Sequence, residues 1–229
     1  SLHGRSCEVG FLARRGLGLS KVLPATAAGR RLHAHGRWHA VRLAPRPDLP
    51  HGLLLASIYA PLESQRHGAE REQWQELMRE HLHALDMQIP TLLMGDFNGA
   101  LFPECDFLST SGSRRAVCPL LAHLLGPGGA WLDVHATLLD TPLPWTFQLL
   151  DTTGKLSASR IDLVLANRAA MALMASASVH SAVRDGGHSP VLVTLHLRSP
   201  STLCWQRPRP QLPALLRLPS TEIRGAVWD

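Results

Sequence analysis

Apolar and polar residues follow two spacings along this chain, and each spacing predicts one kind of secondary structure. The short apolar-rich segments 37–43 and 53–59, separated by a loop rich in proline, predict a pair of strands. Between residues 70 and 87 the apolar side chains recur at intervals of three and four among Glu and Arg, which predicts an amphipathic helix. A second helix is expected over residues 114–125. Further strands are expected at residues 9–13, 91–97, 145–149, 161–165 and 191–197.

Strands with a few helices inserted between them favour an α/β or α+β fold in which two packed sheets are flanked by helices. A chain of 229 residues that is 45% hydrophobic can bury one substantial core, so we expect a single domain over residues 1–198. Prolines interrupt every periodic run after it, which predicts a linker at 199–229. Because the pattern enters a strand by residue 9, we expect a domain that is incomplete at its N-terminus. No apolar stretch has the length that a bilayer requires, so no membrane contact is expected.

The charge of the chain favours an anionic partner. Its formal net charge is +5, and Lys21 and Lys155 are its only lysines. Arginine forks match phosphate oxygens better than lysine does, which points to nucleic acid. However, Arg is enriched here together with Ala, Leu, Pro and Gly, as a GC-rich coding sequence would produce without selection for binding. Charge alone therefore identifies no partner.

Cysteine and histidine spacing predicts no zinc site. The four cysteines lie far apart in the sequence, which is typical of buried or free thiols. His33 and His35 would share one face if residues 33–37 formed a strand, but no third ligand is apparent. Surface histidines are the expected interpretation.

The first candidate for chemistry is a carboxylate and an amide that follow the apolar residues 92–94. In an extended chain Asp96 and Asn98 leave the backbone on the same side, while Phe97 turns to the other. The two polar groups can then share one water, whose proton Asp96 accepts while the amide of Asn98 fixes its lone pair. The alternative is an ordinary turn, because Gly, Asp and Asn are also common turn residues.

Three other residues stand at predicted strand ends. Tyr59 precedes Ala-Pro and can present its phenol to a phosphate, although packing is the usual role of such a tyrosine. Asp162 can orient an imidazole, and a surface pair with Arg160 is its structural alternative. His188 opens the last strand. If it pairs with Asp162, it would be held as an imidazolium that stabilises the charge of a pentavalent phosphoryl group.

In this order, the four signals resemble the endonuclease/exonuclease/phosphatase superfamily over residues 9–197. Within it, the chain is most similar to the apurinic-type endonuclease domain of LINE-like (non-LTR) retrotransposon polyproteins. The segment 205–228 also resembles the linker that such polyproteins place before a reverse transcriptase, although no reverse transcriptase motif is present. The residues that carry the resemblance are Tyr-Ala-Pro at 59–61, Gly-Asp-Phe-Asn at 95–98, Arg-Ile-Asp-Leu-Val-Leu at 160–165 and His-Ser-Pro at 188–190.

The resemblance implies a DNase-I-like, four-layer α/β/β/α sandwich that lacks its first strand-helix-strand portion. It also implies a metal-dependent endonuclease that nicks DNA. Asp96 would position and deprotonate the attacking water, Asn98 would orient it, and Tyr59 would contact the scissile phosphate or the leaving oxygen. His188 would stabilise the transition state while Asp162 holds it, and Mg²⁺ or Mn²⁺ would neutralise the leaving 3′ oxygen. The domain would be monomeric within a larger polyprotein and act in the nucleus, although the sequence carries no localisation signal.

The chain departs from the family pattern on the metal side. The usual Asn and Glu ligands have no counterpart here, and Gly187 occupies the position of a usual Asp. Only weak metal candidates remain, namely Asp96, Asp185 and Glu8. Mg²⁺ depends on anionic oxygen ligands, so these losses predict weak binding and an impaired activity.

Two alternatives follow from the departures. One is a degenerate remnant that binds nucleic acid without cutting it. The other is the phosphatase or phospholipase branch of the same superfamily, although residues 155–159 lack the Cys-Asp-Arg pattern that inositol phosphatases carry there.

Overall fold

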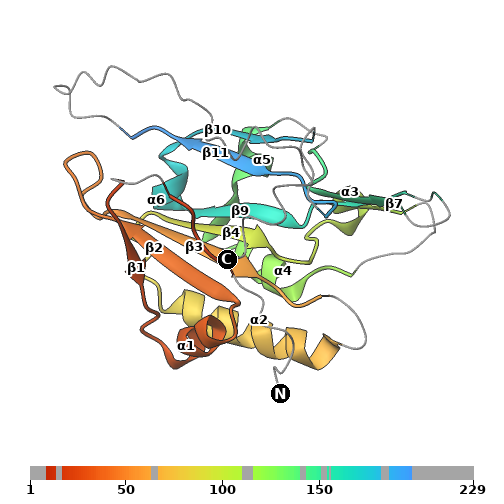
Figure 1. Ribbon diagram of the computed structural model, residues 1–229, viewed down its shortest axis with the longest axis horizontal. Coiled ribbons are helices and arrows are strands. Elements are labelled where there is room, and N and C mark those ends of the chain that lie inside the picture. The colour runs from red at the N-terminus through yellow and green to blue at the C-terminus, as the bar shows by residue number, and fades with distance from the viewer. Residues whose placement is uncertain are drawn as a thin grey trace, which may run out of the picture. The chain divides into compact units, whose positions relative to one another are not determined.

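A six-stranded sheet forms the framework of the computed structural model, which describes residues 9–13, 17–62, 67–109, 116–139, 143–150, 154, 156–181 and 186–197. Its strands are β1 (Leu19–Val22), β2 (Trp38–Leu43), β3 (Leu53–Tyr59), β4 (Thr91–Asp96), β6 (Trp131–Asp133) and β9 (Asp162–Asn167). They lie in the order β1-β2-β3-β4-β9-β6 (Figure 1). Only β3 and β4 are parallel neighbours, and the other neighbouring pairs are antiparallel.

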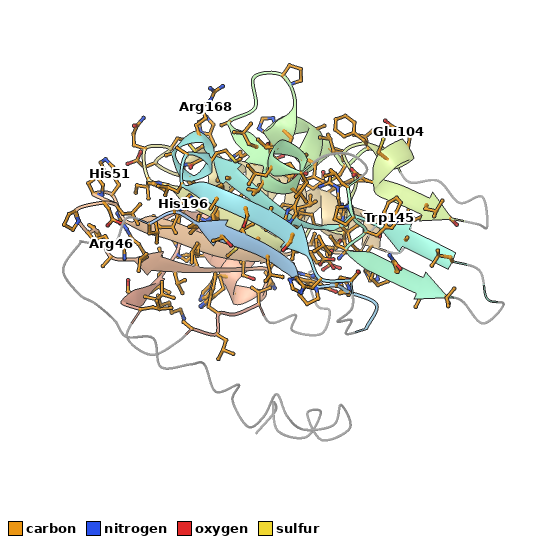
Figure 2. The ribbon with its side chains drawn as sticks, turned by 90° about the horizontal axis from the view of Figure 1, so that it is seen from above. Arg46, His51, Glu104, Trp145, Arg168 and His196 are labelled. Carbon is orange, nitrogen blue, oxygen red and sulfur yellow. The ribbon has the colours of Figure 1, made fainter. Side chains whose placement is uncertain are left out.

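Two smaller sheets accompany the main one. The strands β10 (Met174–Val179) and β11 (Val191–Leu195) pair in antiparallel fashion, and their side chains pack against one face of the main sheet. Figure 2 shows this two-stranded sheet from above, with His196 just past the end of β11. The third sheet has the order β5-β8-β7 and is formed by β5 (Phe107–Ser109), β7 (Phe147–Leu150) and β8 (Leu156–Ser159).

Helices cover the opposite face of the main sheet. Figure 1 shows α1 (Ala27–Ala34) and α2 (Gly68–His83) side by side beneath it. Short helices occupy the connections between strands, and some have side-chain caps: Asp133 accepts from the Ala136 N–H, and Asn167 accepts from the Ala170 N–H. These short helices are α3 (Pro103–Asp106), α4 (Pro119–Leu125), α5 (Val134–Leu138) and α6 (Arg168–Met171).

The central strands are apolar on both faces because both faces are covered. Alternate side chains of β3 enter two separate cores. Leu54, Ala56 and Ile58 belong to the core beneath α1 and α2. Leu53 and Leu55 belong to the core shared with β10 and β11. A residue at the end of β3 or β4 therefore lies between two packed layers.

Most of the predicted elements are confirmed with shifted ends. The strands expected at 37–43, 53–59, 91–97, 161–165 and 191–197 correspond to β2, β3, β4, β9 and β11, and the strand expected at 145–149 corresponds to β7. The helix expected over 70–87 is α2, which ends at His83. The helix expected over 114–125 begins only at Pro119, because the N–H of Cys118 bonds to the carbonyl of Ala100 and keeps the preceding chain extended.

Two strand predictions are wrong. Residues 9–13 form no strand, and β1 takes the edge position beside β2 instead. The side chain of Leu12 is fully exposed, so the apolar residues of that segment are not explained by burial in a sheet. Residues 33–37 are not a strand either, because His33 lies in α1 and His35 caps its end. The helix begins at Thr26, whose side chain accepts from the Gly29 N–H.

Some predictions concern residues outside the described ranges. The proline-rich linker at 199–229 lies there, and so do Glu8 and Asp185. Among the described residues, no helix combines the length and the apolar character needed to span a membrane.

Candidate active site

Three of the predicted site residues lie abreast at one end of the main sheet. Tyr59 is the register partner of Asp96 across the parallel pair β3 and β4, and Asp96 is the partner of Asp162 across β4 and β9. Strand alternation places each of them on the sheet face that packs toward β10 and β11, because Leu55, Met94 and Val164 have the same parity and lie in that core. Three segments that are distant in sequence thus meet at this edge.

Asp96 is held by the backbone and side chain of Asn98. Its Oδ1 accepts from the Asn98 N–H at 2.7 Å, and its Oδ2 accepts from the Asn98 amide at 3.0 Å. The same amide nitrogen also donates to the carbonyl of Ala60 at 2.9 Å. Asn98 therefore fixes the carboxylate of Asp96 and links the ends of β3 and β4.

The backbone at Asn98 differs from the extended chain that the sequence suggested. β4 ends at Asp96, and Asn98 has a φ of 45°, in the left-handed region that asparagine tolerates better than most residues. The backbone therefore leaves the extended conformation at Asn98. This change of direction keeps Asn98 beside Asp96, with the asparagine side chain buried.

His188 pairs with Asp162 from a different part of the chain. Its Nδ1 lies 3.1 and 3.0 Å from the two carboxylate oxygens of Asp162. The ring of Phe147 lies against the imidazole, with 4.8 Å between the ring centroids. The predicted alternative, a surface pair between Arg160 and Asp162, is wrong.

Thr146 holds both sides of this pair and was missed by the sequence reasoning. Its buried hydroxyl oxygen accepts from the N–H groups of Ile161 and Asp162, each at 3.0 Å. Its carbonyl accepts from the N–H of Ser189 at 2.7 Å. The Trp-Thr-Phe run at 145–147 was interpreted only as a strand, and nothing in its spacing distinguished Thr146 from other strand residues.

Comparison with known proteins decides the fold. No protein-family model and no curated protein matches the sequence. Among solved structures, the chain is similar to an AP endonuclease from Archaeoglobus fulgidus, with 17% identity and a TM-score of 0.55 over 71% of this chain and 66% of that one. It is also similar to the Xenopus laevis APE2 catalytic domain, with 18% identity and a TM-score of 0.54 over 73% and 58% of the two chains. The chain thus spans less than two thirds of these two structures.

A third similar structure is the endonuclease domain of TRAS1, a telomere-specific non-LTR retrotransposon, with 14% identity and a TM-score of 0.56 over 81% of this chain and 72% of that one. All three are nucleases of the endonuclease/exonuclease/phosphatase superfamily. The chain has the DNase-I-like fold of this superfamily. The fold that the sequence motifs implied is therefore confirmed.

A DNase-I-like domain calls for a test of its metal donors. Asp96, Asp162 and His188 each offer a ligand atom, and these atoms all lie within 4.8 Å of one another. Mg²⁺ in proteins is commonly held by one or two carboxylates, with water and substrate phosphate completing its shell. The two aspartates fit that donor set for Mg²⁺ or Mn²⁺, and the imidazole nitrogen is better suited to a later transition ion. The residues present therefore fit a divalent cation.

The glycine at position 187 has a geometric reason. Its φ is +93°, and a Cβ at this position would lie 2.9 Å from the carbonyl oxygen of Gln148 and 2.9 Å from the ring of Phe147. The Gln148 N–H also donates to the Gly187 carbonyl at 2.9 Å. The local backbone has therefore adapted to glycine, and a carboxylate cannot simply be added here.

Arg160 stabilises the candidate site from behind. Its Nε donates to Asp106 Oδ1 at 2.8 Å, and its Nη1 donates to Asp133 Oδ2, with all three side chains buried. Burial opposes the charge of the guanidinium, but Asp133 and Asp106 outweigh it and raise the pKa of Arg160. This triad joins α3 and the end of β6 to Arg160, which lies two positions before the start of β9. Sequence reasoning singled out Arg160 but not its partners, which lie 54 and 27 residues away.

Proposed function

We propose that this chain is the hydrolytic domain of an endonuclease that nicks DNA by attack of water on a backbone phosphate. The observation that carries the proposal is the cluster of Asp96, Asp162 and His188, whose ligand atoms lie within 4.8 Å of one another. Groups that exchange a proton with a reactant must lie about 3 Å from it, and a cluster of this size allows one water and one phosphoryl group to meet that condition. The similarity to two AP endonucleases and to the TRAS1 endonuclease domain supports DNA as the substrate.

Each residue has a role in this proposal. Asp96 accepts a proton from the attacking water, and Asn98 keeps the carboxylate in place through its two hydrogen bonds to it. His188, held by Asp162, stabilises the negative charge that develops on the phosphoryl oxygens. Tyr59 contacts the scissile phosphate or the leaving oxygen. A divalent cation held by Asp96 and Asp162, Mg²⁺ or Mn²⁺, would supply charge neutralisation at the leaving 3′ oxygen.

The proposal extends to the context of the domain. The motif order and the similarity to the TRAS1 endonuclease domain support a retroelement origin, with the domain acting within a larger polyprotein next to a reverse transcriptase. Such an element acts on chromosomal DNA, so nuclear action belongs to the same proposal. The net charge of +5 is consistent with a DNA partner.

A plasmid assay tests the activity. The 229-residue chain is incubated with supercoiled DNA, with Mg²⁺, with Mn²⁺ or with EDTA. We expect conversion to open circles that requires a divalent ion and is lost in Asp96→Asn. The control variant is Asp86→Asn, because Asp86 lies in a surface turn outside the cluster and Asp86→Asn removes the same charge.

Two further measurements on the same chain, of DNA binding and of phosphate release, distinguish the alternatives. Salt-sensitive DNA binding by an intact fold, without nicking by this chain or by an N-terminally extended one, would support the non-catalytic remnant. Release of phosphate from an inositol phosphate would support the phosphatase branch. The remnant has a specific observation in its favour, namely the glycine at position 187.

A further inference from the structure

Tyr59 lies against an arginine on the side away from Asp96. The guanidinium carbon of Arg37 lies 5.1 Å from the centroid of the Tyr59 ring. The backbone carbonyl of Arg37 accepts from the Tyr59 N–H at 3.3 Å, and its Nη1 lies 3.5 Å from the Tyr59 carbonyl oxygen. Arg37 precedes the first residue of β2, so it stands opposite Tyr59 across the antiparallel pair β2 and β3. The row of Tyr59, Asp96 and Asp162 thus continues to a fourth residue.

The arginine itself is fixed by α2. Its Nη2 donates to Glu70 Oε1 at 2.7 Å, and the side chain of Arg37 is only 10% exposed. Glu70 lies in the first turn of α2, where a negative charge interacts favourably with the helix dipole. The other oxygen of Glu70 lies 3.3 Å from Nδ1 of His67. Arg37 is held by Tyr59 and Glu70, and Glu70 is held by α2 and His67. The orientation of the guanidinium is therefore fixed without any bound ligand.

We propose that Arg37 is a positioning residue for Tyr59. The inference rests on the proposed function of Tyr59, and it assigns the orientation of the phenol to an ion pair outside the cluster. Tyr59 is the last residue of β3, so its ring stands where the strand ends. The guanidinium of Arg37 lies against that ring and restricts its orientation, because a cation is attracted to an aromatic face. The planar guanidinium suits both the ring and the carboxylate of Glu70, so lysine is not equivalent here.

The chain offers a readout that does not depend on catalysis. Tyr59 is the only tyrosine in the 229 residues, so ring-labelled tyrosine gives one set of NMR signals. In the native chain we expect one ring environment with contacts to the Arg37 side chain. In Arg37→Met, which keeps the aliphatic part of the side chain, and in Glu70→Gln, which removes the charge that holds the guanidinium, we expect shifted signals and faster ring flipping.

The kinetic arm measures nicking by the same full-length variants. We expect kcat to fall about 2- to 30-fold in Arg37→Met, which corresponds to the cation–ring attraction, with little change in the KM for DNA. Arg37→Lys keeps the charge but lacks the planar guanidinium, so its kcat should lie between those of the native chain and of Arg37→Met. Glu76→Gln is the matched control, because Glu76 lies in the same helix and forms an exposed pair with Arg79. Its ring signals and its kcat should equal those of the native chain.

The two arms separate the positioning role from the proposed function. Unchanged tyrosine signals in both Arg37→Met and Glu70→Gln, with the fold intact by circular dichroism, would overturn the positioning role whether or not the chain cuts DNA. An equal fall of kcat in Glu76→Gln would also overturn it, because any charge change in α2 would then suffice. If the native chain cuts no DNA while the ring signals shift as expected, the proposed function fails and the contact between Arg37 and Tyr59 stands.

Discussion

The imidazole of His188 and the carboxylate of Asp162 share hydrogen bonds of 3.0 and 3.1 Å, although the two residues are separated by 26 positions. Asp162 begins β9 in the main sheet, whereas His188 lies in the segment that precedes β11. The pair therefore forms only when this segment has reached the start of β9, at the same edge as Asp96.

Asp162→Asn should greatly reduce nicking without unfolding the chain. The amide has the shape of the carboxylate but no charge, so His188 loses the charged partner that holds its ring in place. We expect a fall of about 10²- to 10⁴-fold in kcat, as is typical when a general acid–base or charge-stabilising partner is lost. The plasmid assay measures the loss, and thermal unfolding should change little. An Asp162→Asn variant as active as the native chain would exclude the proposed role of this pair.

Asn98 can be tested by separating its backbone role from its side-chain role. Asn98→Gly tolerates a φ of 45° but removes the amide that holds Asp96, so we expect an intact fold and slower nicking. Asn98→Ala removes the same amide and adds about 1–2 kcal/mol of backbone strain. Urea unfolding of both variants should therefore show that the alanine variant is the less stable one, while their nicking rates are equally low.

Gly187→Asp should destabilise the chain rather than restore a metal ligand. Both the positive φ and the carbonyl of Gln148, 2.9 Å from the expected Cβ, oppose any side chain at this position. We expect a loss of about 1–3 kcal/mol of unfolding free energy and no gain in Mn²⁺ affinity by calorimetry. Gly154→Asp is the matched control, because its φ is +77° but its surroundings are open. The difference between the two variants measures the collision alone.

Arg160→Met should be one of the most destabilising substitutions in this chain. It leaves the buried carboxylates of Asp106 and Asp133 without their counter-charge, which typically costs about 3–5 kcal/mol. The comparison is Arg79→Met, which removes an exposed pair with Glu76 and should cost less than about 1 kcal/mol. Urea denaturation gives both values. Equal losses would contradict the role assigned to the buried triad.

The stability of the fold should decrease in mild acid because of His81. Burial lowers the pKa of this histidine from 6.5 to about 4. Between these pH values the unfolded chain therefore binds a proton at His81 that the folded chain does not bind. The stability contribution is complete above pH 6.5 and is lost as the pH falls through about 4, with a total of about 3 kcal/mol. Burial also lowers the pKa of His135, which acts in the same direction.

His81→Met tests this pH dependence. The variant removes the titrating ring, so the slope of unfolding free energy between pH 6.5 and 4 should decrease relative to the native chain. His83→Gln is the control, because this histidine lies in the same helix and is exposed. If His83→Gln flattened the slope as much as His81→Met, the effect would not come from burial.

The sequence predicted the parts of this fold whose signals are local and repeated. The strands β3 and β4 are mostly apolar runs of 7 and 6 residues, and α2 carries about four helical turns with one buried face. Motif order also identified Tyr59, Asp96, Asp162 and His188, which the structure brings to one edge. Such runs are informative because a strand buried on both faces requires a nearly continuous apolar run, and a helix buried along one stripe requires apolar residues at intervals of three and four.

The elements that sequence reasoning missed depend on contacts from elsewhere in the chain. The helices α5 and α6 are too short for a periodic pattern, and they are marked mainly by the capping side chains of Asp133 and Asn167. The partners of Arg160 and the clamp at Thr146 are set by which loops meet after folding. The segment 9–13 has the composition of a strand, but it pairs with no strand among the residues that the structure describes.

The row of Arg37, Tyr59, Asp96 and Asp162 forms only when the strands pair in the observed register. Each residue arrives on a separate strand end, and a slip of one position would move a side chain by about 3.3 Å and turn it to the opposite face. His188 joins the row only when the segment before β11 has reached Asp162. A chain still emerging from the ribosome therefore has no complete site, so the activity that we propose would arise late, after the long-range pairings are finished.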